Sequence, residues 1–376
     1  MDNKSPGPIV LFGSGETSPS GQKTFDSLFR LLPPMPKVDL LETPAGFEVN
    51  SELVIRRVAE FLSHHLQNHH PEIRVVPARK LGTAFSPDDP RIASPLLESD
   101  LIFLGPGSPT YAVRQLKNSL AWQYTLARHY LGAAIVLASA ATIAAGAYSL
   151  PVYEIYKVGE DLHWKKGLDL FGLYGMSLIF IPHWNNNEGG QECDSSRCFM
   201  GRERFNRLLG LIPADFTVLG IDEHTALIMD LQSQVCKVVG NGEVTLLHKN
   251  HPNRKPDDPG DLEVLGLNDI ARQRNAHVHQ YSAGQTFPLS EWFPIQIPEP
   301  GTGIPQEVWS LALETNRASE IQDYTPEEVL ILAQVRQTAR EGKDWENADA
   351  IRDQIMALGW EVKDTTDGPE LIRRKP

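Results

Sequence analysis

The strongest constraint on the fold of this chain is an uncharged run, Ala133 to Thr142, in which one serine stands between alanines. A short run rich in Ile, Val and Leu is typical of a strand that helices bury on both faces of a parallel sheet. Ser139 follows the aliphatic residues and would lie at the carboxyl end of that strand. Because ligands of open α/β sheets collect at this end, the run predicts an α/β protein with a candidate functional hydroxyl at position 139.

The residues around Ser139 favour a tight turn from strand to helix. Ala138, Ala140 and Ala141 are small, as such a turn requires, and a serine forced onto it presents its hydroxyl outward. The usual pattern for this nucleophile turn has glycines where this chain has alanines. A serine that only ends a buried strand is therefore the alternative interpretation.

Other segments alternate between strands and helices in the same manner. Short strand-like segments at 8–12, 38–41 and 101–104 each end in a turn rich in Gly or Pro, and 51–65 has helical apolar spacing. The pattern predicts a doubly wound, mostly parallel sheet. The turn Gly13 to Thr17 lacks the third glycine and the lysine of phosphate-binding motifs, so we interpret it as the rim of a site, with nucleotide binding as the alternative.

Two further strand ends carry groups that a reactive serine needs. Gly105 to Tyr111 would expose backbone N–H groups beside Ser108, as in an oxyanion hole, although an ordinary turn has the same composition. His183 ends the apolar run 176–182. A histidine removes the proton of a serine when a carboxylate orients its ring, and Glu154 and Glu160 are the carboxylates that follow the serine.

Composition excludes several classes of protein. The 376 residues carry a formal net charge of -13, which disfavours non-specific nucleic-acid binding. Three cysteines form no disulfide framework, and the first residues lack an apolar signal segment, so we expect a cytoplasmic protein. Leu131 to Leu150 is uncharged but rich in Ala and Gly, so we interpret it as a buried strand and helix and expect no membrane contact.

Four segments in order resemble the serine peptidases typified by dipeptidase E and cyanophycinase, a family with the class I glutamine amidotransferase-like, flavodoxin-like fold. They are 105–108, 139–146, Pro182-His183 with 201–208, and 220–227. The resemblance implies Ser139 as nucleophile, His183 as base, and the N–H groups of Gly107 and Ala140 as oxyanion hole. Glu154 has a spacing from the serine similar to that of the acid in dipeptidase E, and Glu160 competes with it.

The resemblance also bears on the substrate and the cofactors. Ser108, Arg202 and Arg204 match positions that bind substrate in similar enzymes, where an arginine could hold a carboxylate, although the two arginines also fit a charged helix face. We expect a small peptide or amide substrate with a carboxylate near the scissile bond, and no metal or organic cofactor. The alternative is a catalytically inactive binding protein of the same fold.

Composition changes twice after the expected catalytic domain, 1–248. Residues 249–322 are interrupted by prolines and predict a connector with short elements, and 323–376 predict a small helical hairpin module. This last part resembles the C-terminal tail of cysteinyl-tRNA synthetases, but the chain has no synthetase signature HIGH or KMSKS. The resemblance implies tRNA contact through 325–375; the alternative is a packing or dimerisation module, as in a homo-oligomer.

Overall fold

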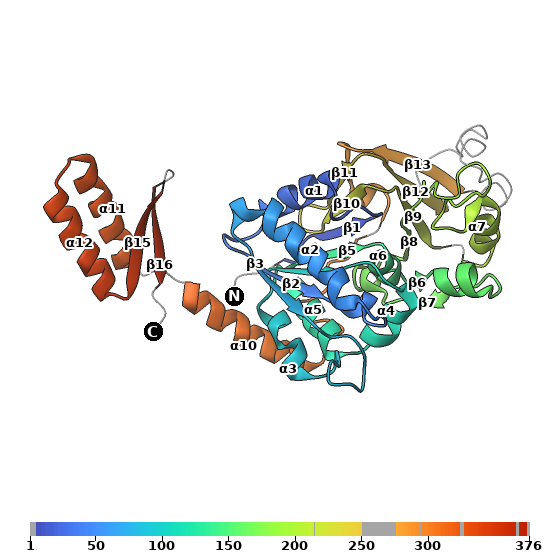
Figure 1. Cartoon of the computed structure of the whole chain (residues 1–376), viewed down its shortest axis with the longest axis horizontal. Helices are drawn as coiled ribbons and strands as arrows, with labels where there is room; N and C mark the ends of the chain where they lie inside the picture. The colour runs from blue at the N-terminus through green and yellow to red at the C-terminus, as the bar shows by residue number, and fades with distance from the viewer. Residues whose placement is uncertain are drawn as a thin grey trace. The chain divides into compact units, whose positions relative to one another are not determined.

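A computed structural model of the chain describes residues 5–213, 215–249, 276–293, 295–323, 327–365 and 368–373. The chain forms two compact units, Met1–Thr315 and Asn316–Pro376 (Figure 1). Among the described residues, no helix has both the length and the apolar character needed to span a bilayer.

The first unit is built on a mixed, mostly parallel sheet of eight strands (Figure 1). Five neighbouring strands run parallel, and three more continue the sheet beside β1 in antiparallel pairs. Their spatial order is β14 (Thr286–Pro288), β11 (Val235–Gly240), β10 (Thr225–Asp230), β1 (Ile9–Phe12), β5 (Ala134–Ala138), β4 (Leu101–Leu104), β2 (Lys37–Leu41) and β3 (Glu72–Val76). The expected mixed α/β class with a mostly parallel sheet is confirmed.

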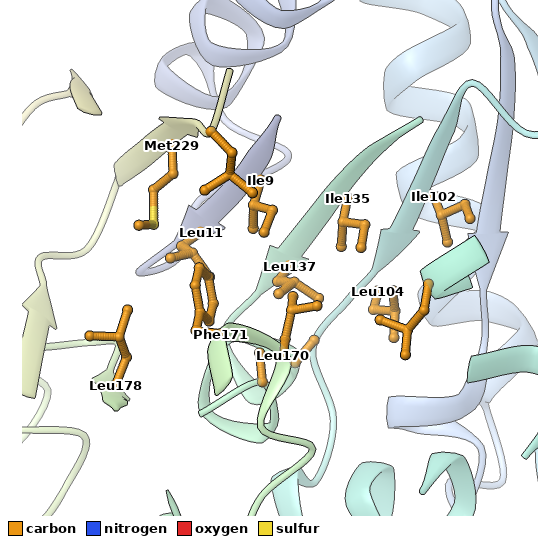
Figure 2. Packing of buried hydrophobic residues seen from close by; sticks show 14 of the residues in the cluster. Ile9, Leu11, Ile102, Leu104, Ile135, Leu137, Leu170, Phe171, Leu178 and Met229 are labelled. Atoms are coloured by element: carbon orange, nitrogen blue, oxygen red, sulfur yellow. The ribbon is translucent and has the colours of Figure 1, made fainter. Parts of the chain in front are cut away.

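Side chains alternate along the central strands and build one core on each face of this sheet. Ile9 and Leu11 point to the face covered by α5 (Leu120–Tyr130) and the 3-10 turn η5 (Leu170–Tyr174), together with residues of β4 and β5 (Figure 2). The opposite face of β1 packs against α1 (Pro19–Phe29) and α2 (Ser51–His65). Both faces are covered, which explains why β1, β4 and β5 contain only apolar residues.

A second sheet of four strands places the end of β8 beside the first sheet. Its order is β13 (Ala276–Ser282), β12 (Glu243–Lys249), β9 (Thr217–Ile221) and β8 (Leu178–Ile181). β8 and β9 are parallel and in register, with Ile181 opposite Gly220. Their carboxyl ends therefore lie side by side, and the residues that follow each strand can meet.

Short helices and hairpins connect these strands. They include α4 (Pro109–Leu116), α6 (Ala140–Ala144), α7 (Gly201–Gly210) and a π-helical turn, η4 (Glu154–Val158). The others are η1 (Thr43–Ala45), η2 (Gln67–His69), α3 (Pro90–Ala93), η3 (Ser94–Glu98), β6 (Tyr148–Ser149), β7 (Lys165–Lys166) and η6 (Leu289–Glu291).

The expected connector at 249–322 contributes to the core of the first unit. β13 pairs with β12 and β14 pairs with β11, and the rings of Tyr281 and Phe287 stack with centroids 3.8 Å apart. The expected boundary at residue 248 therefore differs from the division between the units after Thr315. Short strands that pair with distant partners leave little periodic signal in the sequence, and 250–275 lies outside the described residues.

The second unit consists of two helices and a two-stranded hairpin, with the end of α10 (Gln306–Asp323) before them. Helices α11 (Glu327–Glu341) and α12 (Trp345–Ala357) pack on each other and on the hairpin, α12 against β15 (Trp360–Thr365) and α11 against β16 (Gly368–Arg373). The buried guanidinium of Arg336 donates two hydrogen bonds to the carboxylate of Asp364, at 2.7 and 3.0 Å. The expected helix cap Thr325-Pro326 and most of the basic cluster, Arg374-Lys375, lie outside the described residues.

Candidate active site

Ser139 occupies a sharp turn between β5 and α6. Its backbone has φ +52° and ψ -106°, a conformation that residues with a side chain rarely adopt. The following helix is anchored by the hydroxyl of Thr142, which lies 2.9 Å from the carbonyl oxygens of both Phe12 and Leu137. The turn therefore carries local backbone strain, and Ser139 is partly exposed at the carboxyl end of the sheet.

The side chain of His183 faces the hydroxyl of Ser139. The Oγ of Ser139 lies 2.8 Å from Nε2 of His183, within the range for direct proton transfer. His183 follows β8 with φ +50°, and its backbone N–H donates a hydrogen bond to the carbonyl of Gly13 at 3.3 Å. The turn Gly13 to Thr17, expected at the rim of a site, thus touches the backbone of this histidine.

The carboxylate that contacts His183 belongs to Glu223, in the turn after β9. Its Oε1 lies 2.8 Å from Nδ1 of His183 and also accepts a hydrogen bond from Asn186 at 3.0 Å. The hydrogen bond from His183 is the largest effect on Glu223 and lowers the pKa of this carboxyl. An ionised carboxylate can only accept, so Nδ1 carries the proton and Nε2 is left to accept the proton of Ser139.

The expected acid Glu154 contacts residues of α4 and β7. Burial raises the pKa of its carboxyl, but hydrogen bonds from Thr110 at 2.6 Å and Lys165 at 3.2 Å outweigh burial and lower the pKa. Glu160 instead lies 3.6 Å from His163. Both expected acids are therefore replaced by Glu223 as the partner of His183, because η4 directs Glu154 toward α4 and β7.

The sequence already contained a signal for Glu223. It follows a buried strand inside the segment 220–227, and β9 is the parallel neighbour of β8. Carboxyl ends of paired parallel strands meet at one edge of a sheet, so the residues after β8 and β9 are spatial neighbours. Counting residues from Ser139 missed this relationship, because it depends on strand pairing.

The backbone N–H groups of Gly107 and Ala140 were expected to form an oxyanion hole. Neither has a hydrogen-bond partner in the described part of the chain. Gly107 has φ +147°, and a Cβ at this position would lie 2.0 Å from the carbonyl oxygen of Pro44. Only glycine fits this close approach. The next residue, Ser108, caps α4 by accepting a hydrogen bond from the N–H of Tyr111 at 3.2 Å.

Arg202 and Arg204 are engaged by the loop before α7. Nε of Arg202 lies 3.2 Å from the carboxylate of Asp194, and its side chain is 56% exposed. Arg204 donates to the carbonyl oxygens of Met200 at 2.6 Å and Phe199 at 3.0 Å. These contacts do not support the expected binding of a substrate carboxylate, since the donors of Arg204 serve the loop backbone.

A cavity of about 450 Å³ lies against α4, the helix that packs on α6 directly after Ser139. Its charged lining residues are Arg114, Lys165, Lys166 and Glu154, so cations outnumber carboxylates. The buried hydroxyl of Ser149 also lines it and has no hydrogen-bond partner in the described part of the chain. The rest of the lining is Phe47, Ser108, Thr110, Tyr111, Val113 and Tyr153.

Metal ligands do not gather in the described ranges. No group of three or more His, Cys, Asp or Glu side chains there could hold a metal ion. Cys193 is exposed, Cys198 and Cys236 are buried, and all three thiols are free. Burial raises the pKa of Cys198 to about 12, so this thiol stays protonated near neutral pH.

A solved structure shares the fold of much of this chain. A peptidase from an acI-B1 Actinobacterium superposes with a TM-score of 0.55 at 20% sequence identity, covering 76% of this chain and 98% of that protein. A putative peptidase E protein from Listeria monocytogenes gives a TM-score of 0.43 at 14% identity, over 62% of this chain and 98% of that one. No protein-family profile matches the chain.

Curated cysteine--tRNA ligases match short stretches of the chain. Cysteine--tRNA ligase from Methanosarcina mazei is 48% identical over 46 residues, 12% of this chain and 10% of the ligase. The ligase from Chlamydia trachomatis serovar A is 29% identical over 109 residues, 28% of this chain and 21% of the ligase. The chain thus spans a tenth to a fifth of the length of these relatives.

Proposed function

We propose that the first unit is a serine hydrolase that cleaves a small peptide or amide through Ser139, His183 and Glu223. The observation that carries the proposal is the unbroken chain of two contacts, each 2.8 Å, from the serine hydroxyl through the imidazole to the carboxylate. The fold shared with a solved peptidase supports it. The same fold supports membership of the dipeptidase E and cyanophycinase group, with its amidotransferase-like architecture, as the finer proposal.

Each group has one task in the proposed reaction. His183 takes the proton of Ser139 while Oγ forms a bond to the substrate carbonyl carbon. The N–H groups of Gly107 and Ala140 stabilise the oxyanion, and Glu223 stabilises the imidazolium. The C–N bond then breaks, the leaving amine takes the proton from His183, and water activated by His183 hydrolyses the acyl-enzyme and restores Ser139.

We further propose that the substrate carries an anionic group near the scissile bond. The cavity beside α4 supports this, because its lining contains three cations, Arg114, Lys165 and Lys166, and one carboxylate, Glu154. Ser108 lines the cavity and directly follows Gly107, so a side chain held there would lie beside the proposed oxyanion hole. In this proposal Arg114, Lys165 and Lys166 would bind the anionic group, whereas the sequence pointed to Arg202 and Arg204.

Fluorophosphonate labelling followed by peptide mapping tests the proposed nucleophile. We expect Ser139 to be modified and labelling to vanish in Ser139→Ala, while Ser63→Ala, which removes an exposed hydroxyl on α2, stays labelled. A library of small peptides and amides, compared between wild type and Ser139→Ala, then identifies the substrate. A chain that neither labels at Ser139 nor turns over any library member would support the alternative, an inactive binding protein.

For the second unit we propose contact with tRNA, supported by the short matches to cysteine--tRNA ligases. Retention of labelled tRNA on filters by the full chain at low salt, where phosphate contacts are strongest, tests it. Retention that falls with added salt supports contact. If no tRNA is retained, the packing or dimerisation module is the better proposal, and sedimentation of the full chain then reveals whether it forms a homo-oligomer.

A further inference from the structure

The loop before α7 contains three consecutive residues in a rare backbone conformation. Arg197, Cys198 and Phe199 have φ of +58°, +58° and +66°. None is glycine, and the left-handed region places Cβ against the neighbouring carbonyl oxygen, so each residue is disfavoured there. Such strain persists only where surrounding contacts impose it, and it is concentrated at functional sites.

The contacts that impose this conformation come from the residues around the proposed base. The N–H of Cys198 donates to the carbonyl of His183 at 3.1 Å. Arg197 donates its N–H and Nη1 to the carbonyl of Trp184, at 2.9 and 2.8 Å, and its guanidinium stacks 3.8 Å from the centre of the Trp184 ring. At the other end, Arg204 holds the carbonyl of Phe199. The loop is thus fastened directly to the His183-Trp184 backbone.

The last strained residue places an aromatic ring beside the imidazole. The ring centroids of Phe199 and His183 are 5.7 Å apart, with an angle of 47° between the planes. Tyr156 packs on Phe199 at 5.6 Å and comes from the π-helical turn η4, a second irregular segment. Hydrogen bonds hold the imidazole at both of its nitrogens, and Phe199 contacts the ring itself.

We propose that Phe199 is a positioning residue for His183. The strained loop at 197–199 sets its ring against the imidazole, which limits rotation of that ring away from the line between Ser139 and Glu223. The consequence for catalysis rests on the proposed function, whereas the mechanical role does not. Arg204 supports this arrangement by holding the carbonyl of Phe199, which gives this arginine a role other than substrate binding.

The test uses the full chain and compares Phe199→Ala, Phe199→Tyr and Phe61→Ala. Phe61 is the matched control, because it is also partly buried and stacks on a histidine, His65, at 4.4 Å on the remote helix α2. Proton NMR of each protein follows the Nδ1–H resonance of His183, assigned by its absence in His183→Gln. We expect this resonance to broaden or disappear in Phe199→Ala and to persist in Phe199→Tyr and Phe61→Ala.

Labelling of Ser139 by the fluorophosphonate measures the effect on reactivity. We expect the maximal labelling rate to fall about tenfold or more in Phe199→Ala, because displacement of a catalytic group slows the reaction. In Phe199→Tyr we expect the labelling rate to stay near that of wild type. A His183 resonance that is unchanged in Phe199→Ala overturns the inference. If that resonance responds but wild type is not labelled, only the proposed function fails. Phe199→Leu replaces Phe199→Ala if the latter does not fold.

Discussion

Nδ1 of His183 lies 2.8 Å from Oε1 of Glu223, a residue 40 positions further along the chain. The two residues follow β8 and β9, parallel neighbours that pair Ile181 with Gly220. Asn185 and Asn186 reinforce the contact, since Oδ1 of Asn185 accepts the N–H of Glu223 at 2.8 Å and Asn186 donates to its carboxylate. The loop after His183 therefore holds Glu223 both at its backbone N–H and at its carboxylate.

Replacing Glu223 should affect the chemistry far more than replacing Glu154. Glu223→Gln presents an amide to Nδ1 and favours the wrong imidazole tautomer, so we expect turnover and Ser139 labelling to fall by about 10³–10⁴-fold. Glu154→Gln should leave the labelling rate near wild type, because Glu154 contacts Thr110 and Lys165. Labelling rates of the two variants measure this. Loss of labelling in Glu154→Gln with Glu223→Gln unaffected would reverse the assignment.

The glycine of the proposed oxyanion hole should not tolerate a side chain. A methyl group at Gly107 would lie 2.0 Å from the carbonyl oxygen of Pro44, so Gly107→Ala must displace the loop that carries the N–H donor. We expect kcat to fall by about 10²–10³-fold, the usual cost of removing one such donor. Gly82→Ala is the control, since Gly82 also has positive φ but nothing within 4 Å of the added methyl. Equal losses of kcat in both variants would argue against a role for Gly107.

A site residue could be predicted from the sequence where the neighbouring residues alone indicate its position. Ser139 and His183 each end a buried apolar strand, and this pattern is visible within ten residues of sequence. Their 2.8 Å contact follows from the meeting of strand ends at one edge. Glu223 required knowledge of which strands pair, and spacing along the chain pointed instead to Glu154.

The cavity and the boundaries of the first unit could not be predicted from the sequence, because both depend on contacts between distant segments. Arg114, Lys165 and Lys166 come from α4 and β7, and no sequence pattern joins them. The segment 276–293 has no long apolar run in sequence, but it completes two sheets that the preceding residues had begun. Contacts between distant segments, which a single sequence does not display, decide both features.

The buried imidazole of His129 should make folding stability depend on pH. Burial lowers the pKa of His129 to about 4 from an ordinary value near 6.5, and its Nε2 lies 2.6 Å from the hydroxyl of Tyr174. Because the unfolded chain binds this proton more readily, the contribution to stability is complete above pH 6.5 and is lost as the pH falls toward 4.

The difference between these two pKa values of His129 corresponds to about 3 kcal/mol in the free energy of unfolding. Denaturant unfolding at several pH values measures it, with His129→Gln as a variant that keeps hydrogen-bonding groups but does not titrate. We expect the variant to show a flatter dependence between pH 6.5 and 4. Parallel curves for the two proteins would contradict the role of His129.

Removing the unpaired cations of the cavity should weaken binding of acidic substrates without slowing the chemistry. Arg114 and Lys166 line the cavity with no carboxylate partner within 4.0 Å in the described residues, whereas Lys165 is paired with Glu154. In Arg114→Gln/Lys166→Gln we expect KM for a cleavable acidic peptide to rise about tenfold, equivalent to about 1.4 kcal/mol, with kcat retained. KM for the matching amide-bearing peptide should change little. Lys23→Gln on α1 is the control for net charge, and an equal rise in KM with this variant would mean that long-range charge, and not the cavity, attracts the substrate.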